Sequence, residues 1–165
     1  MELMIVITII LIIAAIEIPN LLRARMSAEQ AAAKANLKSI EAAEITYAVT
    51  YNHGYTSTLS QLGPSNNQMA SPQAADLIDG MLATGRKGGY SYLYIPGPVV
   101  DGKVETYTVN AVPSAPCTTG VAYYSLDSSS QSGVVTQNFQ TVVEHDPFLE
   151  ILKGSMDYGQ RPCSR

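Results

Sequence analysis

The hydrophobic pattern of the chain begins with an apolar run at its N-terminus. Residues 3–18 are apolar at all but two positions, Glu2 stands in front of the run and Pro19 follows it. The apolar residues would cover every face of a helix, and such a helix must be buried in lipid or among other helices. Continued to residue 22, the run is about 20 residues, or about 30 Å, long, which is enough to cross the apolar core of a bilayer.

The next stretch predicts that the same helix continues outside the membrane. Residues 23–52 contain no Gly or Pro and are rich in Ala and other good helix formers. The sequence Asn52-His53-Gly54 then predicts the end of a helix of about 50 residues. Helical spacing gives residues 23–52 one apolar face for a globular head, consisting of Leu37, Ile40, Tyr47 and Tyr51.

Two residues of the apolar run are unusual for a membrane-spanning helix. Pro19 cannot donate a backbone hydrogen bond and crowds the preceding turn, which predicts a kink or a locally unwound stretch between Leu11 and Pro19. Glu17 places a charge in the run. Either Glu17 pairs with Arg23 or Arg25 of a neighbouring molecule, or it is a solvated acid near the membrane surface.

After the helix, the pattern predicts a loop, a short helix and then a sheet. Ser71-Pro72 is typical of a helix start, and a short helix is expected over Ala75–Ala83. From Gly88 the apolar period becomes two, and Asp101-Gly102 predicts a turn between the first two strands. We expect an antiparallel meander whose apolar face packs against the long helix, with strands at residues 90–95, 104–109, 121–126 and 134–137.

Together these elements predict an α+β fold with three parts. Residues 1–22 form the hydrophobic N-terminal helix, residues 23–52 its amphipathic continuation, and residues 53–165 a globular head. The length of 165 residues fits one domain with an appendage. The net charge is −4 and the basic residues form no stripe, so the charge pattern does not predict nucleic-acid binding.

The chain has two cysteines, Cys117 and Cys163, far apart in sequence. Neither lies in a C-x-x-C motif or beside a histidine, which disfavours a zinc site. Export to an oxidising compartment would favour a disulfide between the two cysteines. Such a bond would stabilise the fold by about 4 kcal/mol. Two unrelated buried thiols are the alternative.

Enzyme motifs are absent from the sequence. His53 and His145 are the only histidines, and no nucleophile elbow, zinc-protease motif or phosphate loop occurs. The consecutive residues Glu144-His145-Asp146 could offer metal ligands, but neighbours in sequence rarely converge on one ion. The ten tyrosines suggest electron transfer, yet aromatic residues on strands usually serve packing. We therefore predict no enzyme activity, no cofactor and no metal.

The N-terminal residues resemble those of a known family. The stretch Glu-Leu-Met-Ile-Val-Ile from Glu2, continued by Ala-Ala-Ile-Glu-Ile-Pro-Asn-Leu-Leu-Arg-Ala-Arg up to Arg25, is similar to the N-terminal helix of bacterial type IV pilins. The similarity is strong over residues 2–25 and moderate up to Tyr51. This motif is specific for the superfamily of pilins and pseudopilins, but it does not separate its members.

The resemblance implies a ladle-shaped type IV pilin fold, in which the long helix packs on an antiparallel four-stranded sheet. It implies a subunit that waits in the inner membrane as a single-pass precursor, is cleaved and methylated by a prepilin peptidase, and is assembled by the pilus machinery into a homopolymer on the cell surface. The family's glutamate corresponds to Glu2, which would neutralise the N-terminal amine of an adjacent subunit, and its helix proline corresponds to Pro19. Cys117 and Cys163 would bound the family's C-terminal disulfide loop.

The sequence departs from the family pattern in three places. Only Met1 precedes Glu2, so we expect the chain as given to lack the family's basic leader and the residues before its glutamate. That leader would also supply the positive charges expected on the cytoplasmic side, since Arg23 and Arg25 follow the apolar run. Leu11 replaces the usual glycine, and Glu17 stands where the family has a small apolar residue.

The resulting hypothesis is a structural subunit, not an enzyme, that polymerises through its hydrophobic helix into an extracellular type IV pilus. Twitching motility and cell adhesion are among the functions such a fibre would serve. A type II secretion pseudopilin or a minor pilin is the nearest alternative. A single-pass anchored domain that never polymerises is an alternative from a different class. In this hypothesis the assembly residues are Glu2, Glu17, Pro19, Arg23 and Arg25.

Overall fold

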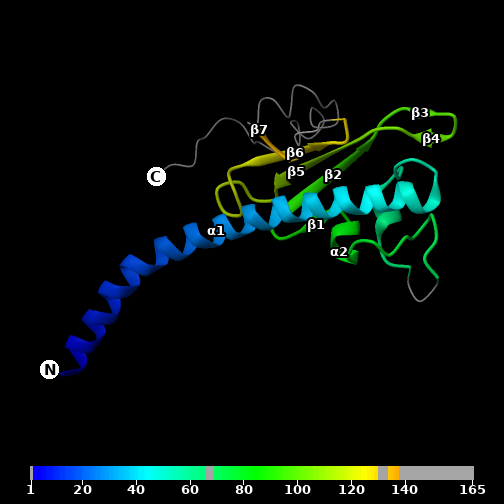
Figure 1. The fold of residues 1–165 in the computed structure, drawn as a ribbon. Helices are drawn as coiled ribbons and strands as arrows, with labels where there is room; N and C mark the ends of the chain where they lie inside the picture. The colour runs from blue at the N-terminus through cyan, green and yellow to red at the C-terminus, as the bar shows by residue number, and fades with distance from the viewer. Residues whose placement is uncertain (1, 66–68, 130–133, 138–165) are drawn as a thin grey trace.

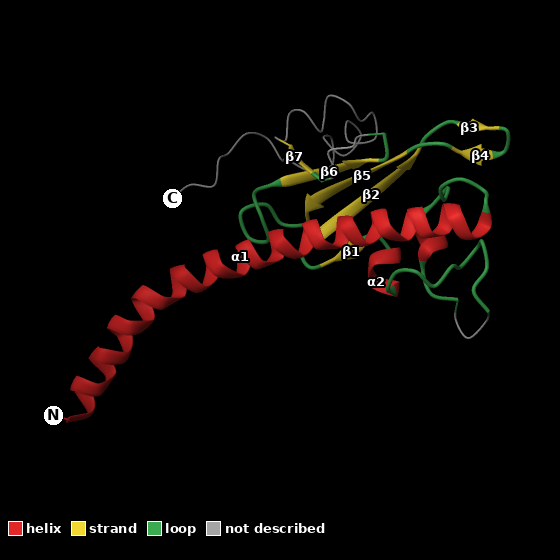
Figure 2. Cartoon of the chain, viewed as in Figure 1, coloured by secondary structure: helices red, strands yellow, loops and turns green. Residues whose placement is uncertain are grey.

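The computed structural model of the chain describes residues 2–65, 69–129 and 134–137. It has two parts: a long N-terminal helix, and a head that covers only the C-terminal half of that helix (Figure 1). The N-terminal half of the helix extends away from the head (Figure 2). The arrangement is therefore α+β, with one long helix packed on an antiparallel sheet.

Helix α1 extends without interruption from Glu2 to Tyr51, with Pro19 inside it. It curves between its N-terminal end and the head (Figure 1). Of the two alternatives predicted between Leu11 and Pro19, a kink or a locally unwound stretch, the unwound stretch is wrong, because α1 is continuous there. Pro19 removes one backbone donor, but the other hydrogen bonds of the surrounding turns remain, so the helix bends instead of opening.

The predicted apolar face of α1 is confirmed. Leu37, Ile40 and Tyr47 are buried against the head, and Tyr51 packs at the edge of the same core. The helix ends where predicted, because Asn52 and Gly54 both have positive φ angles that an α-helix cannot accommodate. The face of α1 toward the head consists of Ala33, Asn36, Leu37, Ile40, Ala43, Glu44 and Tyr47.

The main sheet has five antiparallel strands in the order β1-β2-β5-β6-β7. Four of them, β2, β5, β6 and β7, correspond to the predicted meander, and the two-residue strand β1 adds an edge beside β2. The strands are β1 (Arg86–Lys87), β2 (Tyr90–Pro96), β5 (Tyr107–Pro113), β6 (Tyr123–Asp127) and β7 (Val135–Gln137).

The predicted second strand, residues 104–109, is wrong in its bounds. The turn at Asp101-Gly102 is present, but it joins two short strands, β3 (Val99–Val100) and β4 (Lys103–Val104), that form a separate hairpin beyond the sheet. Strand β5 begins only at Tyr107, which pairs with Pro96. Local alternation of side chains could not distinguish this small hairpin from the start of β5.

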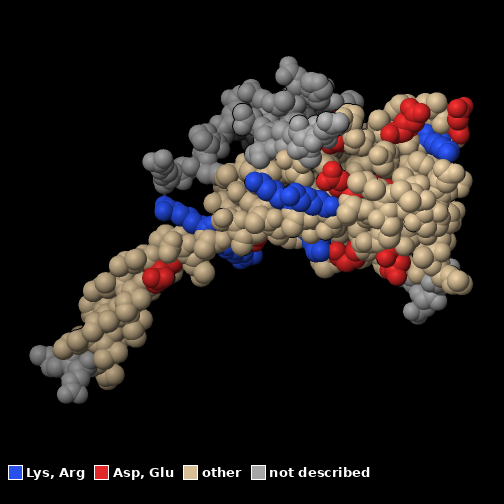
Figure 3. All heavy atoms as spheres, in the orientation of Figure 1, with Lys and Arg blue, Asp and Glu red and all other residues tan. Residues whose placement is uncertain are grey.

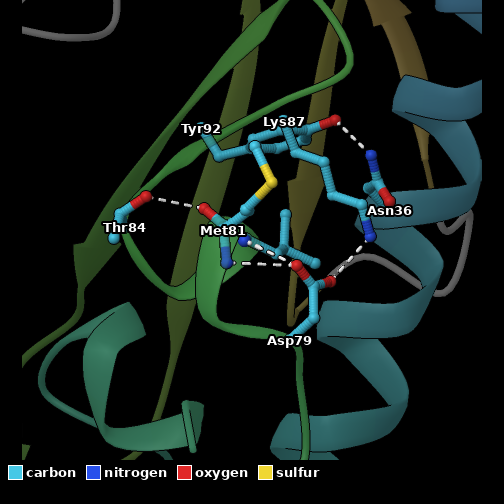
Figure 4. Close-up of polar contacts among 7 residues, drawn as sticks. Asn36, Asp79, Met81, Thr84, Lys87 and Tyr92 are labelled. Carbon is cyan, nitrogen blue, oxygen red and sulfur yellow. Dashed lines mark hydrogen bonds and ion pairs between the residues drawn. The ribbon is translucent and has the colours of Figure 1, made fainter.

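The short helix α2 is also shorter than predicted, since it covers Gly80–Ala83 and not Ala75–Ala83. Asp79 caps it by accepting hydrogen bonds from the backbone N–H groups of Met81 and Leu82, and it also pairs with Lys87 at 2.6 Å (Figure 4). The backbone before it bonds elsewhere: Ala75 N donates to the carbonyl of residue 61 at 2.8 Å, and the next residues bond to residues 62 and 63. That segment crosses the 3-10 helix η1 (Leu59–Leu62) and is not free to coil.

Buried hydrogen bonds join the helix to the head. Asn36 Nδ2 of α1 donates to the Tyr92 hydroxyl of β2 at 2.8 Å (Figure 4). The Tyr47 hydroxyl donates to the carbonyl of Pro72 at 2.9 Å. Because buried polar groups are costly to leave unpaired, these contacts fix the orientation of the sheet on the helix more narrowly than apolar packing alone would.

A buried carboxylate holds the chain just after the helix. The side chain of Glu44 is fully buried and accepts hydrogen bonds from the backbone N–H of Thr56, at 3.0 Å, and from the Thr56 hydroxyl. The Tyr94 hydroxyl donates to the Thr56 carbonyl at 2.8 Å, so α1, the loop and β2 meet here. Burial raises the pKa of Glu44, although the bonds from Thr56 oppose the shift.

This raised pKa makes a pH-dependent contribution to stability. The folded state binds the Glu44 proton more tightly than the unfolded state, so the contribution is complete below the ordinary pKa of glutamate and is lost as pH rises through the raised value. Glu44→Gln removes this titration. We therefore compare the unfolding free energies of wild type and Glu44→Gln. The value for wild type minus the value for Glu44→Gln should fall as the pH rises from the ordinary glutamate pKa toward neutral. Unfolding is followed by tyrosine circular dichroism in detergent, and a difference that does not change with pH would contradict this role of Glu44.

Gly54 permits a close approach between the end of α1 and the hairpin. Its φ is +75°, and a Cβ there would lie 2.5 Å from the carbonyl oxygen of Val104. That oxygen accepts a hydrogen bond from Tyr55 N at 2.9 Å, so it cannot easily move away. Gly102, at the hairpin turn, has a φ of +77° but nothing within 4 Å of the same position.

The two glycines form a matched pair for a stability test. Gly102→Ala should cost about 1 kcal/mol, because only the backbone strain of a left-handed residue is added. Gly54→Ala should cost about 1–3 kcal/mol more, because it adds a steric clash in packed surroundings. Thermal unfolding of both variants measures this difference, and equal losses would show that the contact with Val104 does not constrain the fold.

Candidate functional site

The N-terminal part of α1 is an apolar rod that the described residues of the head leave exposed. Every large apolar side chain from Leu3 to Leu22 is between 52% and 78% exposed. On the face seen in Figure 3 this rod is almost free of charged groups, and the sequence places Glu17 on it. An apolar surface of this extent in water marks a site that binds lipid or protein.

The rod has the length and composition of a membrane span. Within the part of the chain that the structure describes, α1 is the one helix long and apolar enough to cross a bilayer. The polar Thr8 does not oppose this, because its hydroxyl donates to the carbonyl of Met4 at 2.8 Å within the helix. The N-terminal half of α1 is thus a candidate membrane anchor.

Glu17 is the exposed acid on the rod. Among the described residues it forms no ion pair, since the two ion pairs there join Arg25 to Glu29 and Lys87 to Asp79. The charge therefore has to be met by water, a lipid head group or another molecule when the rod is buried.

The two predicted arginines lie where the rod meets the head. Arg23 is exposed, whereas Arg25 Nε donates to Glu29 Oε1 at 2.9 Å one turn later. Arg25 is thus already paired within its own chain, which leaves Arg23 as the freer of the two for a partner. The pairing of Glu17 with an arginine of a neighbouring molecule stays a prediction.

Glu2 is the first residue of α1, at the free end of the rod. It is far along the helix from Ala33, the first residue of α1 that the head buries. Pro19 lies on the exposed part as well. The structure therefore places all five predicted assembly residues on the uncovered part of α1 or at its border with the head.

The tyrosines of the head serve packing. Tyr94 and Tyr107 stack with ring centroids 5.7 Å apart, and Tyr55 meets Tyr107 edge-on at 4.8 Å. Burial raises the pKa of Tyr94 and of Tyr107, so both phenols stay protonated at neutral pH. These rings hold the loop after α1 against the sheet.

Of the two cysteines, Cys117 is disulfide-bonded and has a positive φ of 67°. Cys163, its predicted partner, lies outside the described residues, and so do His145 and its acidic neighbours. Within the described residues, no three His, Cys, Asp or Glu side chains are grouped so that they could hold a metal ion.

Sequence reasoning missed two polar residues on the buried face of α1, Asn36 and Glu44. A signal was present: Glu44 follows Ile40 by four residues and precedes Tyr47 by three, so it had to share their face. A polar residue in the middle of a core stripe indicates a buried hydrogen-bonding partner, which the structure shows to be Thr56.

Comparison with known proteins places this chain in no family: no family model, no curated protein and no solved structure matches it.

Proposed function

We propose that this chain is a structural subunit that polymerises through the exposed rod of α1 into an extracellular filament of the type IV pilus kind. The observation that carries the proposal is a difference along one continuous helix. From residue 33 onward one side of α1 is buried in the head, while the large apolar side chains of residues 3–22 are more than half exposed and no described residue of the head covers them. Copies of the rod can cover one another once they leave the membrane.

The single helix favours polymerisation over simple anchoring. An anchor needs only a span and a flexible linker, whereas here the span continues as the main helix of the head with no break. A stiff connection holds each rod in a defined direction relative to its head, which repeated packing of identical subunits requires. The resemblance of residues 2–25 to type IV pilins supports the same proposal.

Polymerisation can be tested with purified full-length protein. On removal of detergent the protein should form sedimentable fibres visible by negative-stain electron microscopy, since lateral packing then replaces detergent on the rod. A chain that begins at residue 23 keeps the buried helix face and serves as the matched control, which should stay monomeric. A full-length chain that remained monomeric would contradict the proposal and favour an anchored domain.

The role of Glu2 can be tested in cells with a pilus assembly system. Glu2→Ala should strongly reduce surface fibres without lowering the amount of subunit in the membrane, because the amine of a neighbouring subunit, buried among rods, would then lack its partner carboxylate. Thr8→Ala, whose hydroxyl bonds only within its own helix, should leave fibre formation intact. Unchanged fibres from Glu2→Ala would refute the role.

Shearing and mass spectrometry of the fibres distinguish the alternatives. A pilin would be the main component of long surface fibres, a minor pilin a trace component, and a type II secretion pseudopilin absent from the surface fraction.

A further inference from the structure

Residues at alternating steps of four and three can be followed along the whole of α1. In a straight α-helix such a series turns by about 20° per heptad, so it forms one continuous seam only when two helices supercoil around each other. Where α1 crosses the head, the series lies opposite the buried face, and all its residues along α1 are exposed except the half-buried Ala14. Such spacing is that of a coiled-coil seam. We call it the outer seam; it consists of Leu3, Ile7, Ile10, Ala14, Glu17, Leu21, Ala24, Ala28, Ala31, Ala35, Lys38, Ala42, Ile45 and Val49.

The outer seam contains two charged residues, Glu17 and Lys38. They are of opposite sign and lie three heptads apart, which is about 30 Å along the helix. Lys38, like Glu17, has no ion-pair partner among the described residues.

These two charges select one alignment of parallel copies. Shifts by whole heptads keep seam against seam. Copies in register place Glu17 against Glu17, and shifts of one, two or four heptads place it against Ala24, Ala31 or Ile45. A buried charge without a partner is costly. Only a shift of three heptads places Glu17 of one copy against a cation within the seam, Lys38 of the next. A shift of one heptad would instead bring Glu17 beside Arg23 at the edge of the seam, which is the competing arginine pairing that the sequence predicts.

An antiparallel copy gives no such pair. Antiparallel seams bring together the two different positions of the heptad, whereas Glu17 and Lys38 occupy the same heptad position and so never face each other.

Side-chain size selects the same shift. At three heptads, large side chains of the rod meet alanines that lie over the head, and alanines of the first copy meet the large side chains near the end of α1. Small against large is the combination that fills a seam without voids, and six of the eight facing pairs have it. The facing pairs are Leu3–Ala24, Ile7–Ala28, Ile10–Ala31, Ala14–Ala35, Glu17–Lys38, Leu21–Ala42, Ala24–Ile45 and Ala28–Val49.

We infer that a second copy of this chain docks in parallel on the outer seam, displaced by three heptads, with Glu17 paired to Lys38 of its neighbour. This inference rests on the proposed polymerisation and adds its register. Because the two surfaces of the contact differ, each copy leaves one surface open for the next, so the contact propagates into an open chain.

Charge reversal tests the pair. Glu17→Lys or Lys38→Glu alone should raise the protein concentration needed for sedimentable fibres about tenfold, since like charges then meet in the seam. The double variant Glu17→Lys/Lys38→Glu should return to within about twofold of wild type. The matched control is Glu17→Lys/Arg86→Glu, which has the same net charge but places the acid on the exposed Arg86 position of β1, off the outer seam, and it should not recover.

Cysteine cross-linking tests the register directly. Ala14→Cys/Ala35→Cys places the two thiols three heptads apart, so oxidation of detergent-free fibres should give a ladder of covalent oligomers. Ala14→Cys/Ala28→Cys, with the thiols two heptads apart, should give none.

The outcomes separate the two proposals. Suppose that wild-type fibres form normally. The register would then be overturned if the double variant Glu17→Lys/Lys38→Glu formed fibres no better than the single variants, or if only the Ala14→Cys/Ala28→Cys variant cross-linked. Polymerisation would still stand in both cases. Failure of the wild-type chain to form fibres would overturn both.

Discussion

The structure depends on an imbalance along one helix: α1 carries more apolar surface than its head can cover. The sheet and the loops bury the helix from Ala33 onward, while the large apolar side chains from Leu3 to Leu22 stay more than half exposed. Exposed surface of this kind carries a free-energy cost in water of about 25 cal/mol per Å². The chain therefore requires a second environment, either lipid or other copies of itself.

The junction between rod and head is stiff because the same helix forms both. Its attachment to the sheet combines apolar contacts from Leu37 and Ile40 with buried hydrogen bonds, such as that from Asn36 to Tyr92. Glu44 adds a bond to the loop that follows the helix, through Thr56. A chain built this way presents its rod in one direction, which the proposed polymerisation would need for identical contacts to repeat.

Much of this architecture is predictable because its signals are long and periodic. The continuous helix, its end at Asn52, its apolar face and the four strands of the meander all follow from the pattern of the chain. The errors fall on short segments: the extent of α2, the start of β5 at Tyr107, and, of the two alternatives before Pro19, the unwound stretch. In each case hydrogen bonds to residues distant in sequence, or within the intact helix, decided the outcome.

The sequence by itself determined that residues 3–22 form an apolar helix and that residues near Leu37 face a core, since composition and period are local properties. It also determined the spacing of Glu17 and Lys38 along the helix. Only the tertiary structure decided that the head begins to cover α1 at Ala33, and that Thr56 is the partner of the buried Glu44. Coverage and pairing depend on which distant segments meet, and no local pattern encodes that.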